Sequence, residues 1–292
     1  MAEVHVKSPG CLVAEMLRGS WRMSPPPLEF TSSQLKEITP LLQKSGAAAL
    51  SWRRVQHCDL RDFPHARQLH QSYRRHTLRA ALIQQTIKRA ISLLRSIGIE
   101  PILVKGWAAA RLYPEHGLRP YGDIDLCVRP EQLSAAKCAL KNLAEEQHEV
   151  DLHCGFETLG GGDVEEMYAR SQLAQLEETS VLVLSAEDHL RVLSIHMLRE
   201  GAWRPLWLCD IAAAVEARPA RFDWDQCLGS NRRQADWIIC SIALAEQLLG
   251  ANVSDTPASR RANHLPRWLI ATILKEWESE KPSMTERHIR PM

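Results

Sequence analysis

Residues 119–128 read Arg-Pro-Tyr-Gly-Asp-Ile-Asp-Leu-Cys-Val and are the most informative segment of the chain. Two carboxylates one residue apart follow a glycine and lie inside an otherwise apolar run. Side chains alternate between the two faces of a β-strand, so Asp123 and Asp125 share one face while Ile124 and Leu126 share the other. The spacing therefore predicts a strand with one buried face and one acidic face. Because two like charges side by side repel, the pair favours a divalent cation with hard oxygen ligands, such as Mg²⁺.

Composition limits the classes of protein to which the chain can belong. Its 292 residues are 45% hydrophobic and 24% charged, which is enough for one large core or two. The net charge of +1 gives no bulk attraction to nucleic acid or to an anionic membrane. The eight cysteines include no Cys-x-x-Cys pair, which is typical of reduced thiols. There is no apolar run of about eighteen residues and no signal-peptide core, so we expect a soluble, cytoplasmic protein without membrane insertion.

Hydrophobic periodicity predicts strands near the acidic pair and helices on both sides of it. The expected strands cover residues 99–104, 123–128 and 149–154. The expected helices cover residues 31–55, 65–96, 107–113, 130–147, 206–217 and 233–249, with another beginning at residue 185. Ser32 or Ser33 is the expected N-cap of the first helix, and Pro40 is expected to break or kink it.

These patterns predict an α/β (α+β) fold, in which a small mixed β-sheet core is flanked by N-terminal helices and a C-terminal helical region. Residues 1–30 contain three consecutive prolines and little periodicity, and we expect a flexible leader there. Residues 31–175 would hold the helical segment and the core, and residues 176–280 the C-terminal helical region. Residues 281–292 are charged, and we expect a disordered tail.

Asp151, in the third expected strand, is the next candidate for the acidic site. A strand, helix, strand unit brings neighbouring strands together, so Asp151 should lie beside Asp123 and Asp125. Three convergent carboxylates can hold two Mg²⁺ ions, or Mn²⁺ in their place, about 3.5–4 Å apart. One ion would lower the pKa of an attacking hydroxyl and the other would stabilise a triphosphate and its leaving group. This is the chemistry of nucleotidyl transfer.

Lys105 and Gly106 follow the first expected strand and are candidates for binding phosphates. Glycine at a strand-to-helix turn lets backbone N–H groups approach a phosphate, and the N-terminus of the following helix adds partial positive charge. Lys105 and Arg119 could contact triphosphate oxygens. For both residues, a surface charge without a ligand is the alternative.

Five short segments occur in a fixed order along the chain. They are Val104-Lys105-Gly106, Leu112-Tyr113-Pro114, Leu118-Arg119-Pro120, Gly122-Asp123-Ile124-Asp125-Leu126 and Val150-Asp151-Leu152-His153. Together they resemble the uncharacterised bacterial nucleotidyltransferase family, which has the polymerase-β-type fold. The resemblance covers roughly residues 30 to 250.

The resemblance implies a Mg²⁺-dependent, ATP- or other NTP-binding enzyme. Such an enzyme moves a nucleoside monophosphate to an acceptor, a small molecule or a protein, and releases pyrophosphate. Asp123 and Asp125 would be metal ligands, Asp151 a third ligand and general base, and Gly106 would line the phosphate turn. The wider superfamily has Gly-Ser or Gly-Gly at this turn, where this chain has Lys105-Gly106. The interval between the second and third strands is also short, as if a hairpin were missing.

Two other functions remain open. A catalytically degenerate core of this fold would act as a nucleotide-sensing or partner-binding module. A hydrolase with the same carboxylates would release phosphate or nucleotide and form no acceptor adduct.

Several further residues of functional type have structural interpretations. Asp223, in a second Asp-x-Asp pair, is expected to cap a helix. His153 shares a face with the third acid, and a hydrogen-bonded structural role competes with contact to substrate or metal. His196 and Asp210 are expected to tie consecutive helices together. The arginines of the long helix, Arg79 among them, are expected to form a solvated surface.

Overall fold

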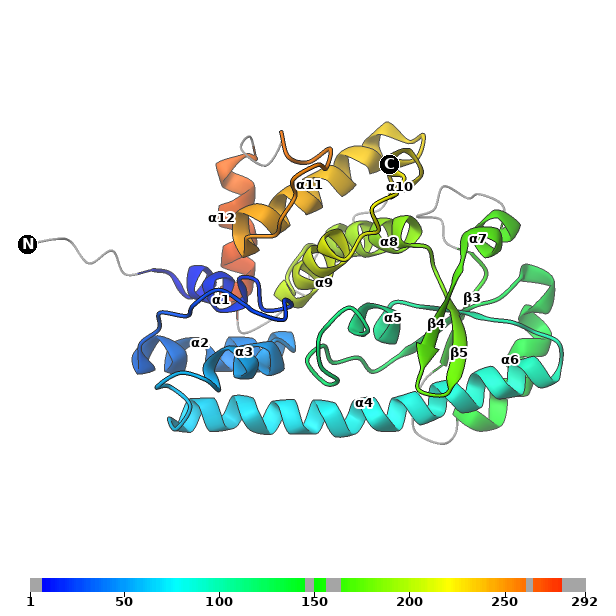
Figure 1. Cartoon of the computed structure of the whole chain (residues 1–292), viewed down its shortest axis with the longest axis horizontal. Helices are drawn as coiled ribbons and strands as arrows, with labels where there is room; N and C mark the ends of the chain where they lie inside the picture. The colour runs from blue at the N-terminus through cyan, green and yellow to red at the C-terminus, as the bar shows by residue number, and fades with distance from the viewer. Residues whose placement is uncertain (1–6, 145–149, 156–163, 261–264, 280–292) are drawn as a thin grey trace, which may run out of the picture.

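A computed structural model describes residues 7–144, 150–155, 164–260 and 265–279 of the chain. In this part of the chain there are twelve α-helices and one mixed five-stranded sheet, which confirms the predicted α/β (α+β) fold class. The sheet lies at one end of the molecule, most helices gather at the other, and the long helix α4 runs beneath both (Figure 1). None of the described helices combines the length and apolar character needed to cross a membrane.

The helices and strands have the following bounds in chain order. The helices are α1 (Pro9–Leu17), α2 (Ser32–Ser45), α3 (Ala48–Val55), α4 (Pro64–Ser96), α5 (Gly106–Ala110), α6 (Leu133–Ala144), α7 (Val164–Arg170), α8 (Ala186–Arg199), α9 (Pro205–Glu216), α10 (Trp224–Leu228), α11 (Arg232–Leu249) and α12 (Arg267–Glu278). The strands are β1 (Ile102–Val104), β2 (Ile124–Cys127), β3 (Val150–His153), β4 (Gln172–Leu176) and β5 (Thr179–Val183).

The sheet has the strand order β3-β2-β1-β5-β4, which places the acidic strand β2 inside it. β2 is antiparallel to β1 and parallel to β3, and α6 makes the connection between β2 and β3. β5 is parallel to β1 and antiparallel to β4. The strand, helix, strand unit expected around residues 123–154 is therefore present.

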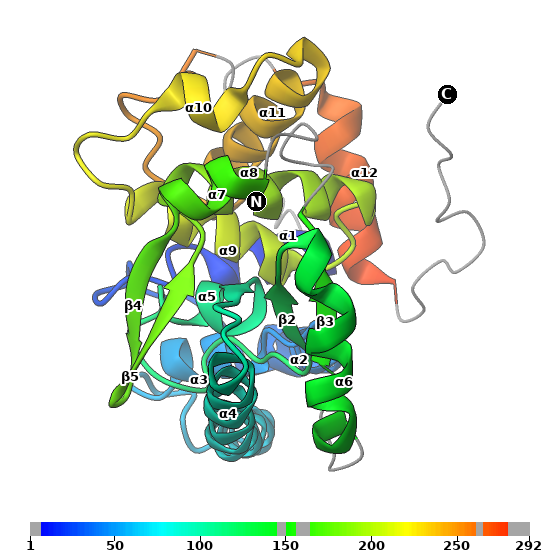
Figure 2. The ribbon, with the colours of Figure 1, turned by 90° about the vertical axis from the view of Figure 1, so that its right-hand side faces the viewer.

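Alternation along β2 separates an apolar face from the acidic one, as the sequence predicted. Ile124 and Leu126 are buried in one cluster with Ile87 and Ile91 of α4 and Leu140 of α6. Figure 2 shows α4 and α6 beside the sheet, with α4 viewed nearly end-on. The other face of β2 carries Asp125 and Cys127, and Cys127 packs in a further hydrophobic cluster with Ile102 and Val104.

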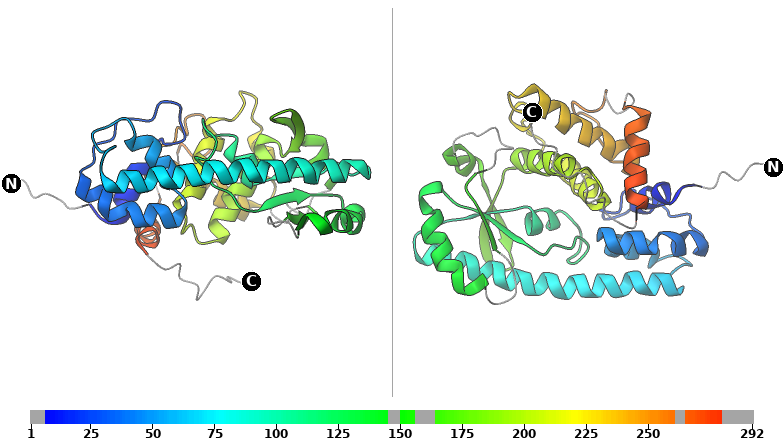
Figure 3. Two further views of the ribbon diagram at one scale, coloured as in Figure 1. Left: turned by 90° about the horizontal axis from the view of Figure 1, so that it is seen from below. Right: turned by 180° about the vertical axis from the view of Figure 1, so that it is seen from behind.

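The long helix α4 connects the two larger of the three hydrophobic clusters in the described part of the chain. Its C-terminal half, with Ile83 and Leu94, packs in the sheet cluster, while Ala66 and Leu69 near its start belong to the large helical core. Seen from below, the helix extends along nearly the whole molecule (Figure 3, left). A helix shared by both cores holds the sheet and the helical part in a fixed relation.

The N-terminal segment differs from the predicted flexible leader. Residues 9–17 form α1, and Leu12, Met16 and Leu17 on it are almost completely buried. α1 packs against α12 near the other end of the chain, so closely that a Cβ on Gly10 would lie 2.2 Å from the backbone oxygen of Leu274. The prediction missed α1 because its apolar partners are supplied by distant helices. Residues 1–6 and the predicted tail over 281–292 lie outside the described residues.

The β4–β5 hairpin was not predicted, and the boundary expected between residues 175 and 176 cuts through it. β5 completes the sheet by pairing with β1, so the core extends to Val183. β4 is short and largely exposed, which leaves little hydrophobic alternation to identify it.

The first predicted helix also differs in detail. Thr31, rather than either following serine, is the N-cap of α2 and forms a capping box with Gln34. Pro40 lies inside α2 without ending it, and the break comes later, where Gly46 adopts a left-handed conformation with φ of 77°.

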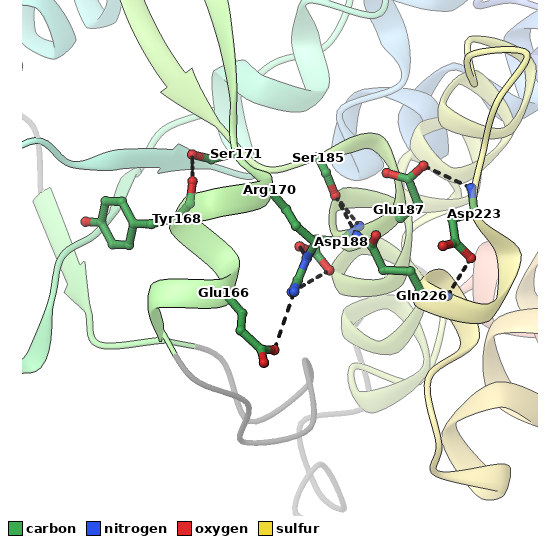
Figure 4. A network of polar contacts seen from close by, with 9 residues as sticks. All are labelled: Glu166, Tyr168, Arg170, Ser171, Ser185, Glu187, Asp188, Asp223 and Gln226. Carbon is green, nitrogen blue, oxygen red and sulfur yellow. Dashed lines mark hydrogen bonds and ion pairs between the residues drawn. The ribbon is translucent and has the colours of Figure 1, made fainter.

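A polar network joins α7 at the sheet end to α8 and α10 in the helical part (Figure 4). Arg170 donates to the buried carboxylate of Asp188 at 3.1 Å, and Ser185 caps α8 by accepting the backbone N–H of Asp188. Asp223 accepts the backbone N–H of Gln226 at 3.0 Å and caps α10. This confirms the capping role predicted for the second Asp-x-Asp pair.

Candidate active site

A cleft of about 540 Å³ lies where the sheet meets the helical part. It is lined from the β1–α5 turn, the segment before β2, and β2, β3, α4, α8 and α9. All the residues predicted for the site line this cleft, namely Lys105, Gly106, Arg119, Asp123, Asp125 and Asp151. The fold thus brings together residues that are spread over nearly fifty positions of sequence.

The carboxylates come from two adjacent strands. β2 and β3 are parallel, and Asp125 is paired in register with Asp151. Paired residues on neighbouring strands point to the same face of a sheet, so these two acids are neighbours. Asp123 directly precedes β2 and is exposed, as is Asp151, whereas Asp125 is only 8% exposed. Asp125 is therefore the innermost acid of the cleft.

Two side chains hold the Asp125 carboxylate. His153 Nε2 lies 2.9 Å from its Oδ1, and because an ionised carboxylate only accepts, the histidine donates. Lys105 Nζ lies 3.4 Å from the same oxygen. Burial acts to raise the pKa of Asp125, but the hydrogen bond from His153 and the charge of Lys105 outweigh it and hold the pKa below its ordinary value. Asp125 is therefore ionised at neutral pH, and His153 has the hydrogen-bonded role that was one of its two interpretations.

The Lys105-Gly106 turn is tight. Lys105 has φ of 49° and ψ of −140°, a conformation that costs most non-glycine residues about 1–3 kcal/mol. Gly106 has φ of 28°, and a Cβ there would lie 3.2 Å from the backbone oxygen of Asp123. The turn thus lies directly against the chain that enters β2. It is followed by α5, which has only five residues.

Arg119 is fixed by a buried ion pair. Its Nη2 lies 2.8 Å from Oδ2 of Asp210 on α9, and its Nε lies 3.2 Å from each carboxylate oxygen. Tyr113 donates its hydroxyl to the same carboxylate at 2.7 Å. Burial acts to lower the pKa of Arg119, but Asp210 outweighs it and the pKa is raised. Asp210 therefore ties α9 to the segment before β2, whereas the sequence suggested only a link between helices.

The carboxylate oxygens in the cleft are ligands that suit a hard divalent cation, since Asp125 is ionised and lies opposite Asp151 on the neighbouring strand. These carboxylates do not, however, form a complete ligand set. Nowhere in the described part of the chain do three His, Cys, Asp or Glu side chains lie close enough together to hold one ion. The Lys105 ammonium now lies beside Asp125, so an ion bound there would replace that contact.

The cleft also contains residues that the prediction left out. His196 on α8 lines it and packs edge to face against Trp207, with ring centroids 5.0 Å apart. Glu200 lies one helical turn further on, and Arg79 and Arg204 line the cleft as well. The spacing of His196 and Glu200 places them on one helix face, which is a sequence signal. Nothing local in the sequence separates Arg79 from the solvated arginines of α4.

A larger cavity of about 740 Å³ lies in the helical part. It is lined by Arg22, Glu216 and Trp224 among others, and Arg22 and Glu216 form an ion pair at 2.6 Å. None of the predicted site residues lines it. The smaller cleft therefore remains the candidate active site.

The mixed sheet, with Asp123 just before β2, Asp125 on β2 and a third aspartate in register on β3, is consistent with the α+β core of a nucleotidyltransferase. The chain matches a family described as uncharacterised nucleotidyltransferase over residues 31–153 and 144–250. These matches cover well over half of the chain, which therefore belongs to that family. Comparison with curated proteins and with solved structures gave no match.

Proposed function

We propose that the protein is a Mg²⁺-dependent nucleotidyltransferase that moves a nucleoside monophosphate from an NTP to an acceptor and releases pyrophosphate. The observation that carries this proposal is the convergence of all the predicted site residues on one cleft. Membership of a nucleotidyltransferase family supports the reaction class. Neither observation identifies the base or the acceptor, because this fold serves many acceptors.

In this proposal, Asp123, Asp125 and Asp151 would hold two divalent ions, Mg²⁺ or Mn²⁺. Bound ions would lower the pKa of the acceptor hydroxyl and neutralise charge on the phosphates. The protein's own contribution is to keep Asp125 ionised and oriented through His153 and Lys105. Asp151, exposed and in register with Asp125, would accept the proton of the acceptor.

The phosphates would lie against the Lys105-Gly106 turn. Displaced from Asp125 by an ion, Lys105 would be free to contact phosphate oxygens, and Gly106 leaves room for a close approach of the backbone. Arg119 adds positive charge at the cleft wall, although its Nε and Nη2 groups donate hydrogen bonds to Asp210.

A nucleotide-sensing or partner-binding module is the second candidate. Two observations favour it. Lys105 contacts Asp125, and no three His, Cys, Asp or Glu side chains among the described residues lie close enough together to hold a metal ion. A protein that keeps this contact would bind a nucleotide without turnover.

Pyrophosphate release with Mg²⁺ and each of the four NTPs, with candidate acceptors supplied, tests the proposal. We expect release by the wild type and a loss of at least about 100-fold in Asp123→Asn and Asp125→Asn, because each variant removes a carboxylate charge at the metal site. Asp225→Asn is the matched control, since it alters an exposed acid of the other Asp-x-Asp pair. Products without an acceptor adduct would identify a hydrolase.

Nucleotide binding, measured by calorimetry on the same samples, separates the two candidates. Tight binding with no release for any acceptor would support the sensing module. Equal release by wild type and Asp125→Asn would refute catalysis by these carboxylates.

A further inference from the structure

One wall of the cleft is strongly basic and is made by elements outside the predicted site. It contains His76 and Arg79 of α4, Arg119 before β2, and Arg204 at the N-cap of α9, and we call it the arginine wall. Of its arginines, only Arg119 has a carboxylate partner in the described structure. Neither Arg79 nor Arg204 forms an ion pair with a described residue, although the Asp210 and Asp123 carboxylates act on Arg204 from further away.

Arg204 is held in place without being neutralised. Its Nε donates to the backbone oxygen of Ser45 at 2.7 Å. The guanidinium lies against Gly46, where a Cβ would lie 2.5 Å from its Nη2. Its terminal nitrogens have no hydrogen-bond or ion-pair partner in the described part of the protein. Burial and then the positive charge of Arg119 lower the pKa of Arg204, and the Asp210 and Asp123 carboxylates offset them only in part, so a bound anion would favour the charged guanidinium.

Arg79 lies against the segment that carries Asp123. A Cβ on Gly122 would lie 2.9 Å from Arg79 Nη2, so the guanidinium reaches the residue before the first acid of the pair. No described side chain pairs with it. By contrast, Lys88 on the same helix contacts Glu177 at 2.6 Å. Arg79 is exposed, as the sequence predicted for the arginines of α4, and it also lines the cleft beside the residue that precedes Asp123.

His76 completes the wall with an unpaired polar atom. Its Nδ1 is buried and has no hydrogen-bond partner among the described residues. Burial, then the charges of Arg75 and Arg204, lower the pKa of His76 to about 4, so it is neutral at pH 7. A buried nitrogen without a partner costs about 1–3 kcal/mol, which a ligand oxygen or donor would recover.

We propose that the arginine wall is a subsite for a phosphate group, in which Arg79 and Arg204 bind phosphate oxygens. Guanidinium groups match phosphate geometry through paired N–H donors, and two that line one cleft without an ion-pair partner among the described residues favour an ion with several negative charges. The phosphate belongs either to the NTP or to a phosphorylated acceptor. The inference rests on the proposed function for the reaction, but the subsite itself is defined by binding.

Calorimetric titration with inorganic pyrophosphate in EDTA tests the subsite without turnover or metal. We expect the wild type to bind and Arg79→Gln and Arg204→Gln each to bind roughly 10- to 100-fold more weakly, since each loses a charge-assisted contact. Arg74→Gln is the matched control, because Arg74 is exposed on the same helix and does not line the cleft. Absence of binding by the wild type, or unchanged affinity in both variants, would overturn the proposal.

Titration with ATP and with adenosine identifies the source of the phosphate. If both variants bind ATP more weakly than the wild type but bind adenosine with the same affinity, the arginine wall holds the phosphates of the NTP. If pyrophosphate affinity falls and ATP affinity does not, the wall holds a phosphate of the acceptor. Arg204 also supports Ser45, so if Arg204→Gln fails to fold, Arg79→Gln decides alone. Pyrophosphate binding in a protein that transfers no nucleotide would refute the proposed function and leave the subsite in place.

Discussion

Removing the buried carboxylate of Asp210 should destabilise the protein strongly. Asp210 is completely buried and Arg119 is 7% exposed, and Arg119 and Tyr113 direct four hydrogen bonds at the carboxylate. Asp210→Asn keeps the shape of the side chain but leaves the Arg119 guanidinium buried without a counterion. Breaking a buried pair in this way costs about 3–5 kcal/mol.

Urea unfolding followed by circular dichroism measures this cost as a change in the free energy of unfolding. The double variant Arg119→Met, Asp210→Leu removes both charges. Its loss in free energy of unfolding should be much smaller than the sum of the losses in Arg119→Met alone and Asp210→Leu alone, because no lone charge remains. Glu100→Gln is the comparison for an accessible pair, since Arg95 and Glu100 are 35% and 39% exposed and such pairs contribute roughly 0–1 kcal/mol. A loss below about 1 kcal/mol in Asp210→Asn, or additive single effects, would refute the reasoning.

Two further predictions concern a buried histidine and the tight turn. Burial, then the charge of Arg111, lower the pKa of His189 to about 4 from 6.5, so the unfolded chain binds more protons between these values. The free energy of unfolding should therefore fall as pH drops from 6.5 to 4, by roughly 3 kcal/mol from this residue. Urea unfolding at several pH values should show that His189→Gln lacks this part of the decline, whereas His57→Gln, which changes an exposed histidine, keeps it. An unchanged decline in His189→Gln would show that His189 does not cause it. Lys105→Gly relieves the strained turn and should be about 1 kcal/mol more stable to urea than Lys105→Met, although both lose the ammonium and should release pyrophosphate more slowly. Equal stability of the two variants would show that the turn is not strained.

Local patterns in the sequence predicted much of the site. The alternation of Asp123 and Asp125 with Ile124 and Leu126 depends only on strand geometry, and the structure has that alternation. The strand, helix, strand order placed Asp151 beside Asp125 because such a unit has few ways to fold. The capping role of Asp223 also follows from nearby residues, which is why it was predictable.

Residues whose environment comes from distant parts of the chain were not predictable in this way. Helix α1 was missed because its apolar face is buried by α12, over two hundred residues away. Asp210 and Arg119 are ninety-one positions apart, and only packing of α9 on the segment before β2 joins them. The β4–β5 hairpin is stabilised by pairing with β1 rather than by its own pattern.

The acidic strand, the Lys105-Gly106 turn and the class of fold follow from side-chain alternation and short-range order, so they could be predicted from sequence. Which charges have an opposite charge beside them depends on the packing of distant segments. Arg119 and Arg79 look alike in sequence, yet Arg119 is paired with a buried aspartate, while Arg79 lines the cleft and pairs with no side chain in the described part of the chain. The physical reason is that the energy of a charge depends on its burial and on its neighbours in space, and the fold sets both.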